Sequence, residues 1–458
     1  MTQDVRPGEP ITAPRVFSSR ISYWTLGCRL NQHDTAAMRS TLSEKGWGEA
    51  GPDDEPDVVV INTCTVTARA DQEARQLIRR LARRHPGARL VITGCYAQRA
   101  PGEVAAIPGV DLVLGTAERD RIAELLGSPA RAWERISFTP SVAVGPARAR
   151  RPMASAAPLS FGRTRALLKV QDGCDAFCSY CVVPYVRGRS RSLPLREALD
   201  QGRRLLDAGF HELVVTGADL GSYGLDRGAR GLLPALVEGL LSLGETHRVR
   251  LSSIEPNKVD AALVALIGAE PRLCRHLHLP LQSGSHAVLR SMRRRYSPED
   301  YACLIERIAA RGLVAIGADV IVGFPGEREG DFEATFRLIE RLPLSYLHVF
   351  RYSPRPGTRA TEKTGVEELP SDTDRGAARE RSERLRALGE SKRGSFYRSL
   401  IGATLPGLVE GGSAAEDLTA MTDLYAPVRL KRRPATRGIV PIRVESIHDG
   451  ILAGSTGG

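Results

Sequence analysis

Short apolar segments alternate with amphipathic segments along most of this 458-residue chain. Near the start, residues 21–28, 57–64, 89–95 and 111–115 have the length and composition of buried strands, and a stretch with helical spacing follows each of them. Strands that alternate with helices pair in parallel, because each helix returns the chain to the same end of the sheet. The pattern therefore predicts an α/β fold that begins with an open parallel-sheet domain over residues 19–127.

The same alternation returns near residue 165 and repeats six times. The expected strands are residues 165–171, 212–217, 248–254, 276–281, 315–324 and 346–352. Six strand–helix units predict a partial (β/α)6 barrel, whose active site should lie at the carboxyl ends of the strands. We assign this barrel to residues 161–392, with a charged helix over residues 374–400 at its end.

Two other segments have different patterns. Residues 128–160 are rich in Pro, Ala, Arg and Ser and show little periodicity, which is typical of a linker, with one short strand expected near Ile136–Phe138. Residues 393–458 contain short apolar segments between turn residues, a pattern that suits a small β-barrel. We therefore expect three folded units and one linker.

Three cysteines lie just after the first predicted strand of the central barrel, at its expected catalytic rim. Cys174, Cys178 and Cys181 are separated by three and two residues. Thiolates so close together suit an iron–sulfur cluster, and three protein ligands on a four-iron cluster leave one iron open for a substrate or cofactor. Two alternatives stay open at this point: a zinc site completed by a fourth donor or by water, and buried structural thiols.

A second set of three cysteines, Cys28, Cys64 and Cys95, is spread over the N-terminal domain, and each ends a predicted strand. Because the carboxyl ends of parallel strands share one edge, we expect the three thiols to meet at one crevice, where α/β sheets bind ligands. We interpret them as ligands of a second cluster; the alternative is three unrelated buried thiols. Cys274 and Cys303 have no such partners and are interpreted as structural.

The CxxxCxxC spacing, with Tyr180 just before the third cysteine, resembles the radical S-adenosylmethionine superfamily. The resemblance implies that S-adenosylmethionine chelates the open iron through its amino and carboxylate groups. It also implies that one electron from this [4Fe–4S] cluster cleaves the sulfonium and yields a 5′-deoxyadenosyl radical.

Two three-cysteine sets in this order, over nearly the whole chain, resemble the methylthiotransferase family within that superfamily. The resemblance implies an N-terminal α/β domain with an auxiliary [4Fe–4S] cluster, a radical S-adenosylmethionine barrel and a C-terminal, RNA-binding TRAM β-barrel. The implied reaction inserts sulfur and a methyl group at an unactivated C–H bond. It would use two [4Fe–4S] clusters, two molecules of S-adenosylmethionine, and a reductant protein such as a flavodoxin or ferredoxin.

The residues after Cys64 favour one branch of this family. The segment NTCTVTARAD, with Thr65, Val66 and Thr67, resembles the branch that methylthiolates N6-threonylcarbamoyladenosine next to the anticodon of tRNA, as do TLGCRLNQ and RHLHLPLQSGS. The isopentenyladenosine branch tends to have NTCSIRE here, and the branch that modifies a ribosomal protein has NTCGFI. Those two branches remain alternatives, together with a non-enzymatic iron–sulfur sensor that binds RNA.

Further residues at predicted strand ends are candidates for contact with S-adenosylmethionine. Gly217 and Asp219 stand where the superfamily has a turn for the methionyl amino group. The full set is Tyr180, Gly217, Asp219, Glu255, Gln282, Asp319 and Gly323. Plain loops, structural hydrogen bonds and the conformational freedom of glycine in a turn are the alternatives.

The charge balance favours a polyanionic partner such as tRNA. The chain has 64 Lys plus Arg against 53 Asp plus Glu, a net charge of +11, which suits contacts with phosphates. The candidates for RNA contact are Arg187, Arg189, Arg429, Lys431, Arg432, Arg433 and Arg437. A further basic group consists of Arg75, Arg79, Arg80, Arg83 and Arg84. For this group, and for Arg187 and Arg189, a solvated charged face is the alternative.

The first nineteen residues contain no apolar core of a signal peptide, and no apolar stretch has the length of a membrane span. We therefore expect a cytoplasmic protein without membrane contact, in which thiols stay reduced and available as metal ligands.

Overall fold

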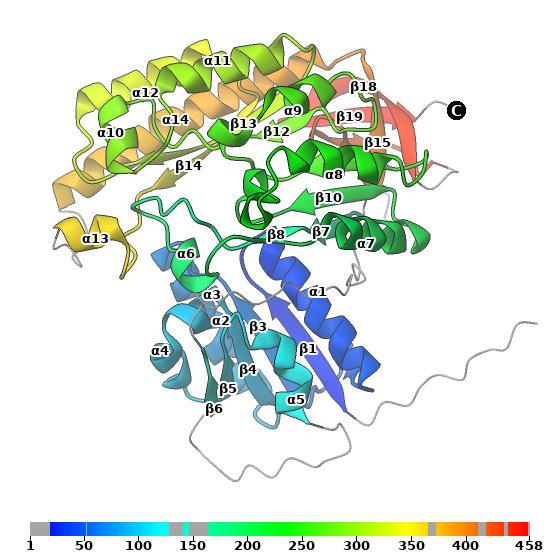
Figure 1. Ribbon diagram of the computed structural model, residues 1–458, viewed down its shortest axis with the longest axis vertical. Coiled ribbons are helices and arrows are strands. Elements are labelled where there is room, and N and C mark those ends of the chain that lie inside the picture. The colour runs from blue at the N-terminus through cyan, green and yellow to red at the C-terminus, as the bar shows by residue number, and fades with distance from the viewer. Residues whose placement is uncertain are drawn as a thin grey trace, which may run out of the picture.

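The computed structural model describes residues 19–51, 53–127, 141–145, 164–364, 372–410, 418–434 and 438–456. Figure 1 shows the N-terminal sheet below the central unit and the C-terminal barrel at the upper right. The predicted α/β fold class, with an open parallel sheet, a partial barrel and a small closed β-barrel, is confirmed.

The N-terminal unit is an open sheet in the order β2-β1-β3-β4-β5-β6, with all neighbouring strands parallel. Its strands are β1 (Arg20–Thr25), β2 (Gly48–Glu49), β3 (Val58–Thr63), β4 (Arg89–Gly94), β5 (Val110–Leu114) and β6 (Ser141–Ala143). Its helices are α1 (Arg29–Glu44), α2 (Ala68–Arg84), α3 (Cys95–Arg99), α4 (Pro101–Ala105) and α5 (Ile122–Leu126), with the 3-10 turn η1 (Arg119–Arg121).

The central strand β3 is buried along its whole length and apolar over its first four residues, because helices cover both faces of the sheet. Val59 and Ile61 belong to the core on the α2 side, whereas Val58 and Val60 belong to the core with α1 and α5. The strand β6 lies inside the segment that we expected to be a linker, and the strand expected near Ile136–Phe138 lies outside the described residues.

The central unit has six parallel strands in chain order, in two sheets of three. These are β7 (Ala166–Lys169), β10 (Glu212–Thr216), β11 (Arg248–Leu251), β12 (His276–His278), β13 (Ala315–Val322) and β14 (Tyr346–Arg351). The two sheets are joined where the Cys274 amide donates to the Val249 carbonyl at 2.8 Å. The predicted partial barrel is therefore present, and one continuous apolar core lies between its strands and the helices that pack on them.

The central unit also contains helices, most of which cover the outside of the barrel (Figure 1). They are α6 (Val183–Val186), α7 (Leu195–Asp207), α8 (Leu232–Leu241), α9 (Ala261–Leu266), α10 (His286–Ser291), α11 (Pro298–Ala309), α12 (Glu329–Arg341) and α13 (Arg359–Thr364). Short elements complete the unit: β8 (Gln171–Asp172), β9 (Arg191–Ser192), η2 (Leu220–Ser222), η3 (Leu225–Arg227) and η4 (Pro256–Lys258).

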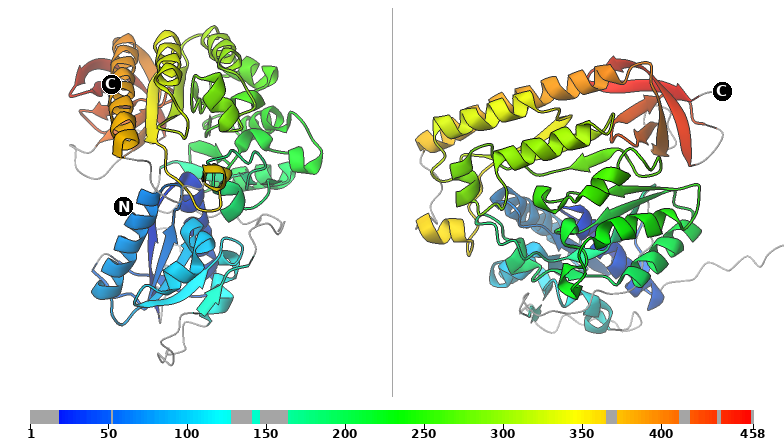
Figure 2. Two further views of the ribbon diagram at one scale, coloured as in Figure 1. Left: turned by 90° about the vertical axis from the view of Figure 1, so that its left-hand side faces the viewer. Right: turned by 45° about the horizontal axis from the view of Figure 1, so that its top comes forward.

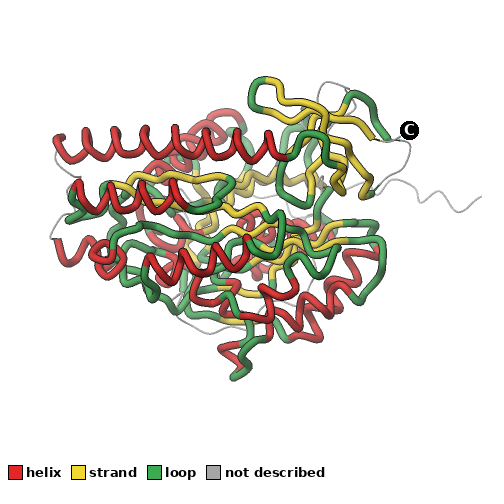
Figure 3. The backbone as a smooth tube through the Cα atoms, turned by 90° about the horizontal axis from the view of Figure 1, so that it is seen from above, coloured by secondary structure: helices red, strands yellow, loops and turns green. Residues whose placement is uncertain are grey.

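The long helix α14 (Asp372–Ser399) packs on β14 and leads directly into the C-terminal barrel (Figures 2 and 3). It runs through residue 393, at which we expected the third unit to begin, and the first barrel strand starts only at Thr404. The barrel is closed in the order β15-β16-β17-β19-β18. Its strands are β15 (Thr404–Glu410), β16 (Thr419–Thr422), β17 (Pro427–Leu430), β18 (Ile439–His448) and β19 (Ile451–Thr456).

Two buried arginines of β11 dock the C-terminal barrel on the central unit. Arg250 is fully buried, pairs with Glu212 at 2.7 Å, and donates to the carbonyls of Thr422 and Asp423 at 2.8 and 3.1 Å. Arg248 pairs with the same carboxylate and donates to two further carbonyls of the barrel. Buried charges are stable only when they are paired and hydrogen-bonded, so this network holds the turn between β16 and β17 in a defined position.

Among the described residues, no helix combines the length and the hydropathy that a membrane span requires.

Candidate active site

A cavity of about 450 Å³ lies where the three units meet. Its wall includes Cys28, Cys64 and Cys95 from the N-terminal sheet, Asp319 from a strand of the central unit, and Tyr425 from the C-terminal barrel. The carboxyl edge of the N-terminal sheet and the barrel strands of the central unit therefore open into one space.

Each N-terminal thiol lies beyond the carboxyl end of a strand, as the strand-end argument predicts, with Cys28 three residues past the end of β1. Cys28 is the N-cap of α1, Cys64 follows β3, and Cys95 begins α3 after β4. The glycines before two of them permit this close approach. A Cβ on Gly27 would lie 2.6 Å from Cys64 Cβ, and one on Gly94 would lie 2.4 Å from a backbone oxygen of β3; both glycines have φ of +96°. A side chain at either position would push the strand ends apart.

The buried environment of two of these thiols, Cys64 and Cys95, disfavours their deprotonated form. Burial raises the pKa of the Cys95 thiol to about 12 and also raises the pKa of Cys64, while the charge of Arg187 acts in the opposite direction. Thiolates, and not thiols, bind metal ions. The site therefore suits a cationic metal centre, which would stabilise the deprotonated sulfurs.

The spacing of the thiols bears on the zinc alternative. A single zinc ion with Zn–S bonds of about 2.3 Å holds its sulfurs within about 4 Å of one another. Within the described ranges, neither cysteine set has its three sulfurs within 4.8 Å of one another. The thiols are thus spread more widely than a single zinc ion requires, which disfavours the zinc alternative for both sets.

The second cysteine set lies on the loop after β8. A Cβ on Gly173, whose φ is +74°, would lie 2.1 Å from the backbone oxygen of Arg189, so the loop can fold back on itself only with glycine here. The Cys178 sulfur accepts a hydrogen bond from Arg294 at 3.4 Å. Burial raises the pKa of Cys174 well above its usual range, as in the first set.

The two cysteine sets share one wall. Val182 follows Cys181 directly, and Val186 is the last residue of α6. These two valines form a small buried apolar cluster with Cys95. The segment that follows the second cysteine set therefore packs against a thiol of the first set, and residues of α6 also line the cavity.

Among the candidates for S-adenosylmethionine contact, Asp219 lies beside Cys174. Its Oδ2 atom is 3.5 Å from the Cys174 sulfur and accepts hydrogen bonds from Lys258 and Ser222 at 2.5 and 2.9 Å. Its Oδ1 atom is buried and has no hydrogen-bond partner in the described part of the chain. A buried carboxylate oxygen without a donor is destabilising. A cationic amino group would satisfy it, so this site fits the amino end of S-adenosylmethionine.

Other candidates lie in different surroundings. Gly217 lines the cavity, where a Cβ would lie 2.8 Å from the Gln171 side chain. Glu255 is already paired with Arg294 at 2.5 Å. Tyr180 accepts a weak hydrogen bond from the same guanidinium at 3.4 Å and packs against an apolar cluster that includes Phe324.

Backbone conformation accounts in part for the presence of Gln282 and Gly323 at their positions. Gln282 has φ of +69°, and its amide donates to the Asp319 carbonyl at 2.8 Å. A Cβ on Gly323, whose φ is +71°, would lie 2.6 Å from Ala378 Cβ on α14. The turn and the approach of α14 thus account for the glycine without a nearby adenine, which favours the structural alternative.

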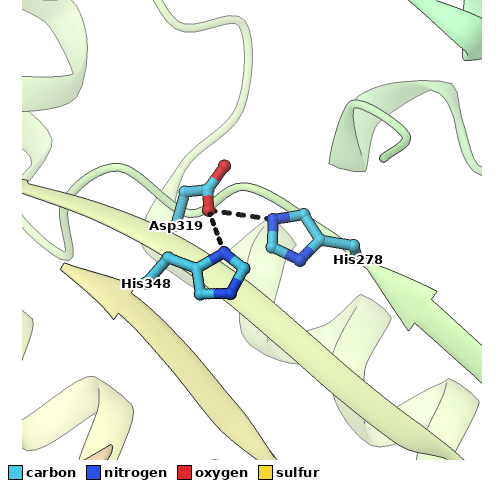
Figure 4. Close-up of side chains that lie close together, drawn as sticks. All are labelled: His278, Asp319 and His348. Atoms are coloured by element: carbon cyan, nitrogen blue, oxygen red, sulfur yellow. Dashed lines mark hydrogen bonds and ion pairs between the residues drawn. The ribbon is translucent and has the colours of Figure 1, made fainter. Parts of the chain in front are cut away.

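Asp319 belongs to a hydrogen-bonded group whose two histidines, His278 and His348, no sequence motif indicated. Figure 4 shows two imidazoles turned toward one oxygen of its carboxylate: His278 Nε2 lies at 2.9 Å and His348 Nδ1 at 3.2 Å. Burial raises the pKa of Asp319, but these hydrogen bonds outweigh it and hold the pKa well below its usual range. The carboxylate therefore remains ionised and keeps both rings oriented toward the cavity.

The hydrogen bonds continue from this group toward the C-terminal barrel. The Tyr346 hydroxyl lies 3.1 Å from His278 Nδ1 and 2.8 Å from His276 Nε2. The His276 ring stacks on Tyr425, with ring centroids 4.5 Å apart. The sequence contains a weak indication of these residues. His276 and His278 are two positions apart on one strand and therefore share a face.

Two arginines suggested as RNA contacts occupy unlike positions. Arg187 is 3% exposed and pairs with Asp34 of α1 at 3.2 Å and with Asp172 at 3.0 Å. It thus ties the N-terminal unit to the central one, and neither an exposed phosphate contact nor a solvated face describes it. Arg189 is exposed, pairs with Asp175 at 2.8 Å, and lies over the Phe177 ring.

The basic residues of the C-terminal barrel are exposed where the structure describes them. These are Arg429, Lys431, Arg432 and Arg433, and Arg437 lies outside the described residues. Lys431 pairs with Glu445 at 2.8 Å. In the second basic group, Arg79, Arg80, Arg83 and Arg84 are exposed along α2, while Arg75 donates to the Tyr96 hydroxyl at 3.0 Å.

The two cysteines outside these sets differ in burial. Cys274 is buried, as a structural thiol would be, but Cys303 is exposed on α11.

Known families match two parts of this chain. Residues 20–115 match the family described as Uncharacterized protein family UPF0004, and residues 168–339 match the Radical SAM superfamily. The first match covers the N-terminal sheet through β5, and the second runs from β7 into α12.

Similar proteins cover nearly the full chain. The threonylcarbamoyladenosine tRNA methylthiotransferase MtaB of Aquifex aeolicus is 37% identical over 90% of this chain and 96% of its own length. MtaB of Bacillus subtilis is 37% identical over 81% of this chain and 80% of its own length. A tRNA-2-methylthio-N(6)-dimethylallyladenosine synthase of Roseobacter denitrificans is 31% identical over 97% and 100%.

Among solved structures, the radical S-adenosylmethionine methyltransferase TsrM of Kitasatospora setae aligns with a TM-score of 0.54. The alignment covers 77% of this chain and 78% of that chain at 16% sequence identity, a likeness of fold alone.

Proposed function

This chain belongs to the methylthiotransferase family of radical S-adenosylmethionine enzymes, in the MtaB branch, and we propose that it methylthiolates C2 of N6-threonylcarbamoyladenosine next to the anticodon of tRNA. The observation that carries this proposal is the shared cavity. Both the N-terminal cysteine edge and the strands of the central barrel open into it.

We propose that Cys174, Cys178 and Cys181 hold one [4Fe–4S] cluster and that Cys28, Cys64 and Cys95 hold a second. When bound, the two clusters and two molecules of S-adenosylmethionine supply the carbon radical, the methyl group and the site that handles sulfur. A flavodoxin or ferredoxin is the proposed source of electrons.

The protein's own residues would position the reactants and exclude water. Val182, Val183 and Val186 give the wall between the cysteine sets an apolar surface, which limits water near the reacting atoms. Asp219 is suited to hold the amino end of S-adenosylmethionine next to Cys174. Phe350 lines the cavity and is 44% exposed, so a flipped-out base has an aromatic surface on which to stack.

The C-terminal barrel would bind the body of the tRNA. Its exposed arginines and lysine can contact phosphates, which supply affinity without sequence readout. Because its turn also contributes Tyr425 to the cavity wall, tRNA binding and placement of the target base would depend on the same unit.

A relative named for dimethylallyladenosine makes N6-dimethylallyladenosine the second candidate substrate. Mass spectrometry of tRNA nucleosides from a strain lacking this gene tests both. We expect the 2-methylthio form of N6-threonylcarbamoyladenosine to disappear and to return with the wild-type gene but not with a Cys174→Ala gene. Loss of the dimethylallyl product instead would assign the other branch, and unchanged levels of both in a strain without a paralogue would refute tRNA methylthiolation.

A further inference from the structure

Arg29 is a cavity residue whose charge no carboxylate of the described chain neutralises. It follows Cys28 and lines the cavity. Its Nη2 atom donates to the Tyr425 hydroxyl at 3.0 Å, and its guanidinium carbon lies 5.7 Å from the centroid of that ring. Neither contact supplies negative charge, so the guanidinium keeps its capacity to bind an anion.

The other arginine of the cavity differs in this respect. Arg187 is buried and pairs with Asp34 and Asp172. Its charge lowers the pKa of the Cys64 and Cys95 thiols, against the effect of burial. The charge of Arg187 is therefore already paired with carboxylates and acts on the cysteine edge of the cavity.

The charge of Arg29 affects residues on the wall of the cavity opposite the cysteines. Burial lowers the pKa of His276, and the charge of Arg29 adds to this effect; burial raises the pKa of Tyr346, and the charge of Arg29 acts against it. Both residues belong to the barrel wall of the cavity and lie beside Tyr425. The guanidinium thus faces the space between the central barrel and the C-terminal barrel.

The position of Arg29 is unfavourable for the helix that carries it. It is the first residue of α1, whose first turn contains no acidic residue. A cation at a helix N-terminus is repelled by the positive end of the helix dipole. An anion bound by the guanidinium would reduce this repulsion.

Tyr425 is held in place at a conformational cost. Its φ is +58°, which is rare for a bulky residue. The docking network fixes the turn before it, since Arg250 donates to the carbonyls of Thr422 and Asp423. Strained backbone of this kind concentrates at ligand sites. The C-terminal barrel therefore presents the Tyr425 hydroxyl to Arg29 in a fixed geometry.

The proposed substrate carries one group that matches this pair. In N6-threonylcarbamoyladenosine, threonine is attached through its amine, so its carboxylate is free and, with a pKa of about 3.5, ionised at neutral pH. The ring carbon C2 and the N6 substituent flank N1 of the same ring. A base that presents C2 to this cavity therefore brings the carboxylate into it as well.

We propose that Arg29, positioned by Tyr425, binds the free carboxylate of the threonylcarbamoyl group and so selects this nucleoside over uncharged N6-substituted adenosines. This inference rests on the proposed function and adds a residue that determines its specificity.

Two substrates and three variants test the proposal in the reconstituted holoenzyme. The substrates are anticodon stem-loops with N6-threonylcarbamoyladenosine or with its methyl amide, which lacks only the negative charge. The variants are Arg29→Gln, Arg29→Lys and the matched control Arg39→Gln, which removes the same charge from the same helix near Glu49. The readouts are kcat/KM for methylthiolation and stem-loop affinity by fluorescence anisotropy.

We expect Arg29→Gln to lower kcat/KM for the acid by about 10- to 100-fold and to leave the amide within about threefold. Wild type should prefer the acid by a similar factor, and Arg29→Lys should retain part of this preference. Arg39→Gln should change neither substrate.

Equal losses on acid and amide, or no preference in wild type, would overturn the assignment. So would loss of iron or of the cluster absorbance in Arg29→Gln, because Arg29 would then serve the cluster next to Cys28. A wild-type enzyme that modifies neither stem-loop would instead refute the proposed function, and this inference with it.

Discussion

The guanidinium of Arg29 lies 3.0 Å from the hydroxyl of Tyr425, although 396 positions separate the two residues in the chain. The contact links the first helix of the N-terminal unit to a turn of the C-terminal barrel across the wall of the cavity. Loss of the Tyr425 hydroxyl should therefore affect the reaction even though the barrel is distant from both cysteine sets in sequence.

We expect Tyr425→Phe to reduce kcat/KM on the threonylcarbamoyl stem-loop by about three- to tenfold, since one hydrogen bond to a charged group is lost while ring stacking on His276 remains. Steady-state kinetics with a Tyr397→Phe control on α14 measures this. The formation of 5′-deoxyadenosine without tRNA should not change. A Tyr425→Phe enzyme with wild-type kinetics would show that the hydroxyl does not position Arg29.

The two cysteine sets should have separable roles, because each lies in a unit with its own core. Replacing Cys28, Cys64 and Cys95 with Ala should roughly halve the iron content and abolish methylthiolation, but reductive formation of 5′-deoxyadenosine should continue. Replacing Cys174, Cys178 and Cys181 should abolish both products and leave the absorbance of one cluster.

Iron analysis, absorbance spectra and product chromatography of the anaerobically reconstituted proteins test this division. Full methylthiolation by the N-terminal variant would refute an auxiliary cluster. Loss of 5′-deoxyadenosine from a folded N-terminal variant would refute separate roles.

Asp219 should matter for S-adenosylmethionine and not for the cluster. Asp219→Asn removes the charge that would face the amino group, so we expect a roughly tenfold or greater loss in S-adenosylmethionine affinity, typical of a charge-assisted hydrogen bond. Equilibrium dialysis with the reconstituted enzyme measures it, and iron content should be unchanged. Asp226→Asn, whose carboxylate accepts from the Ser192 amide at 3.0 Å, is the matched control. Equal affinities in both variants would exclude the assigned contact.

The docking of the C-terminal barrel should weaken in acid. Burial alone would raise the pKa of Glu212, but Arg250 and Arg248 outweigh it and lower the pKa from 4.5 to about 2. A depressed folded-state pKa stabilises the protein above the unfolded value of 4.5, and this contribution is lost as the pH falls from about 4.5 toward 2.

Urea unfolding of cluster-free protein between pH 6 and pH 3 tests this dependence. Glu212→Gln should be less stable at pH 6, because two buried arginines lose their counterion, and its stability should fall less with pH than that of wild type. Glu238→Gln, exposed on α8, removes the same charge as a control. Parallel pH profiles for wild type and Glu212→Gln would contradict the prediction.

The basic residues of the C-terminal barrel should set the salt dependence of tRNA binding. Removing the barrel would expose Arg248 and Arg250, so point variants are the better test. Neutralising Arg429, Lys431 and Arg432 together should lower the slope of log affinity against log salt by about 2 to 3, because each phosphate contact contributes about 0.7–0.9. Filter binding at several salt concentrations, with Arg379→Gln on α14 as control, measures it. An unchanged slope would place the phosphate contacts elsewhere.

Much of the architecture follows from local patterns. The alternation of apolar and amphipathic segments determines the parallel sheets, and strand-end positions bring Cys28, Cys64 and Cys95 to one edge whatever the details of packing. The spacing of Cys174, Cys178 and Cys181 is local, so its chemistry is readable without a fold. The strand–helix alternation and the cysteine spacing depend on residues that are close in the chain, so they can be read directly from the sequence.

Only the tertiary structure decided which distant residues share the cavity. Arg187 looks like one member of an exposed basic segment, but its burial against Asp34 depends on how two units dock. His278, Asp319 and His348 come from three strands, and the pair of Arg29 and Tyr425 comes from opposite ends of the chain. Such contacts are set by packing between elements, and no local pattern encodes them, because hydrogen bonds and charges act through space and not along the sequence.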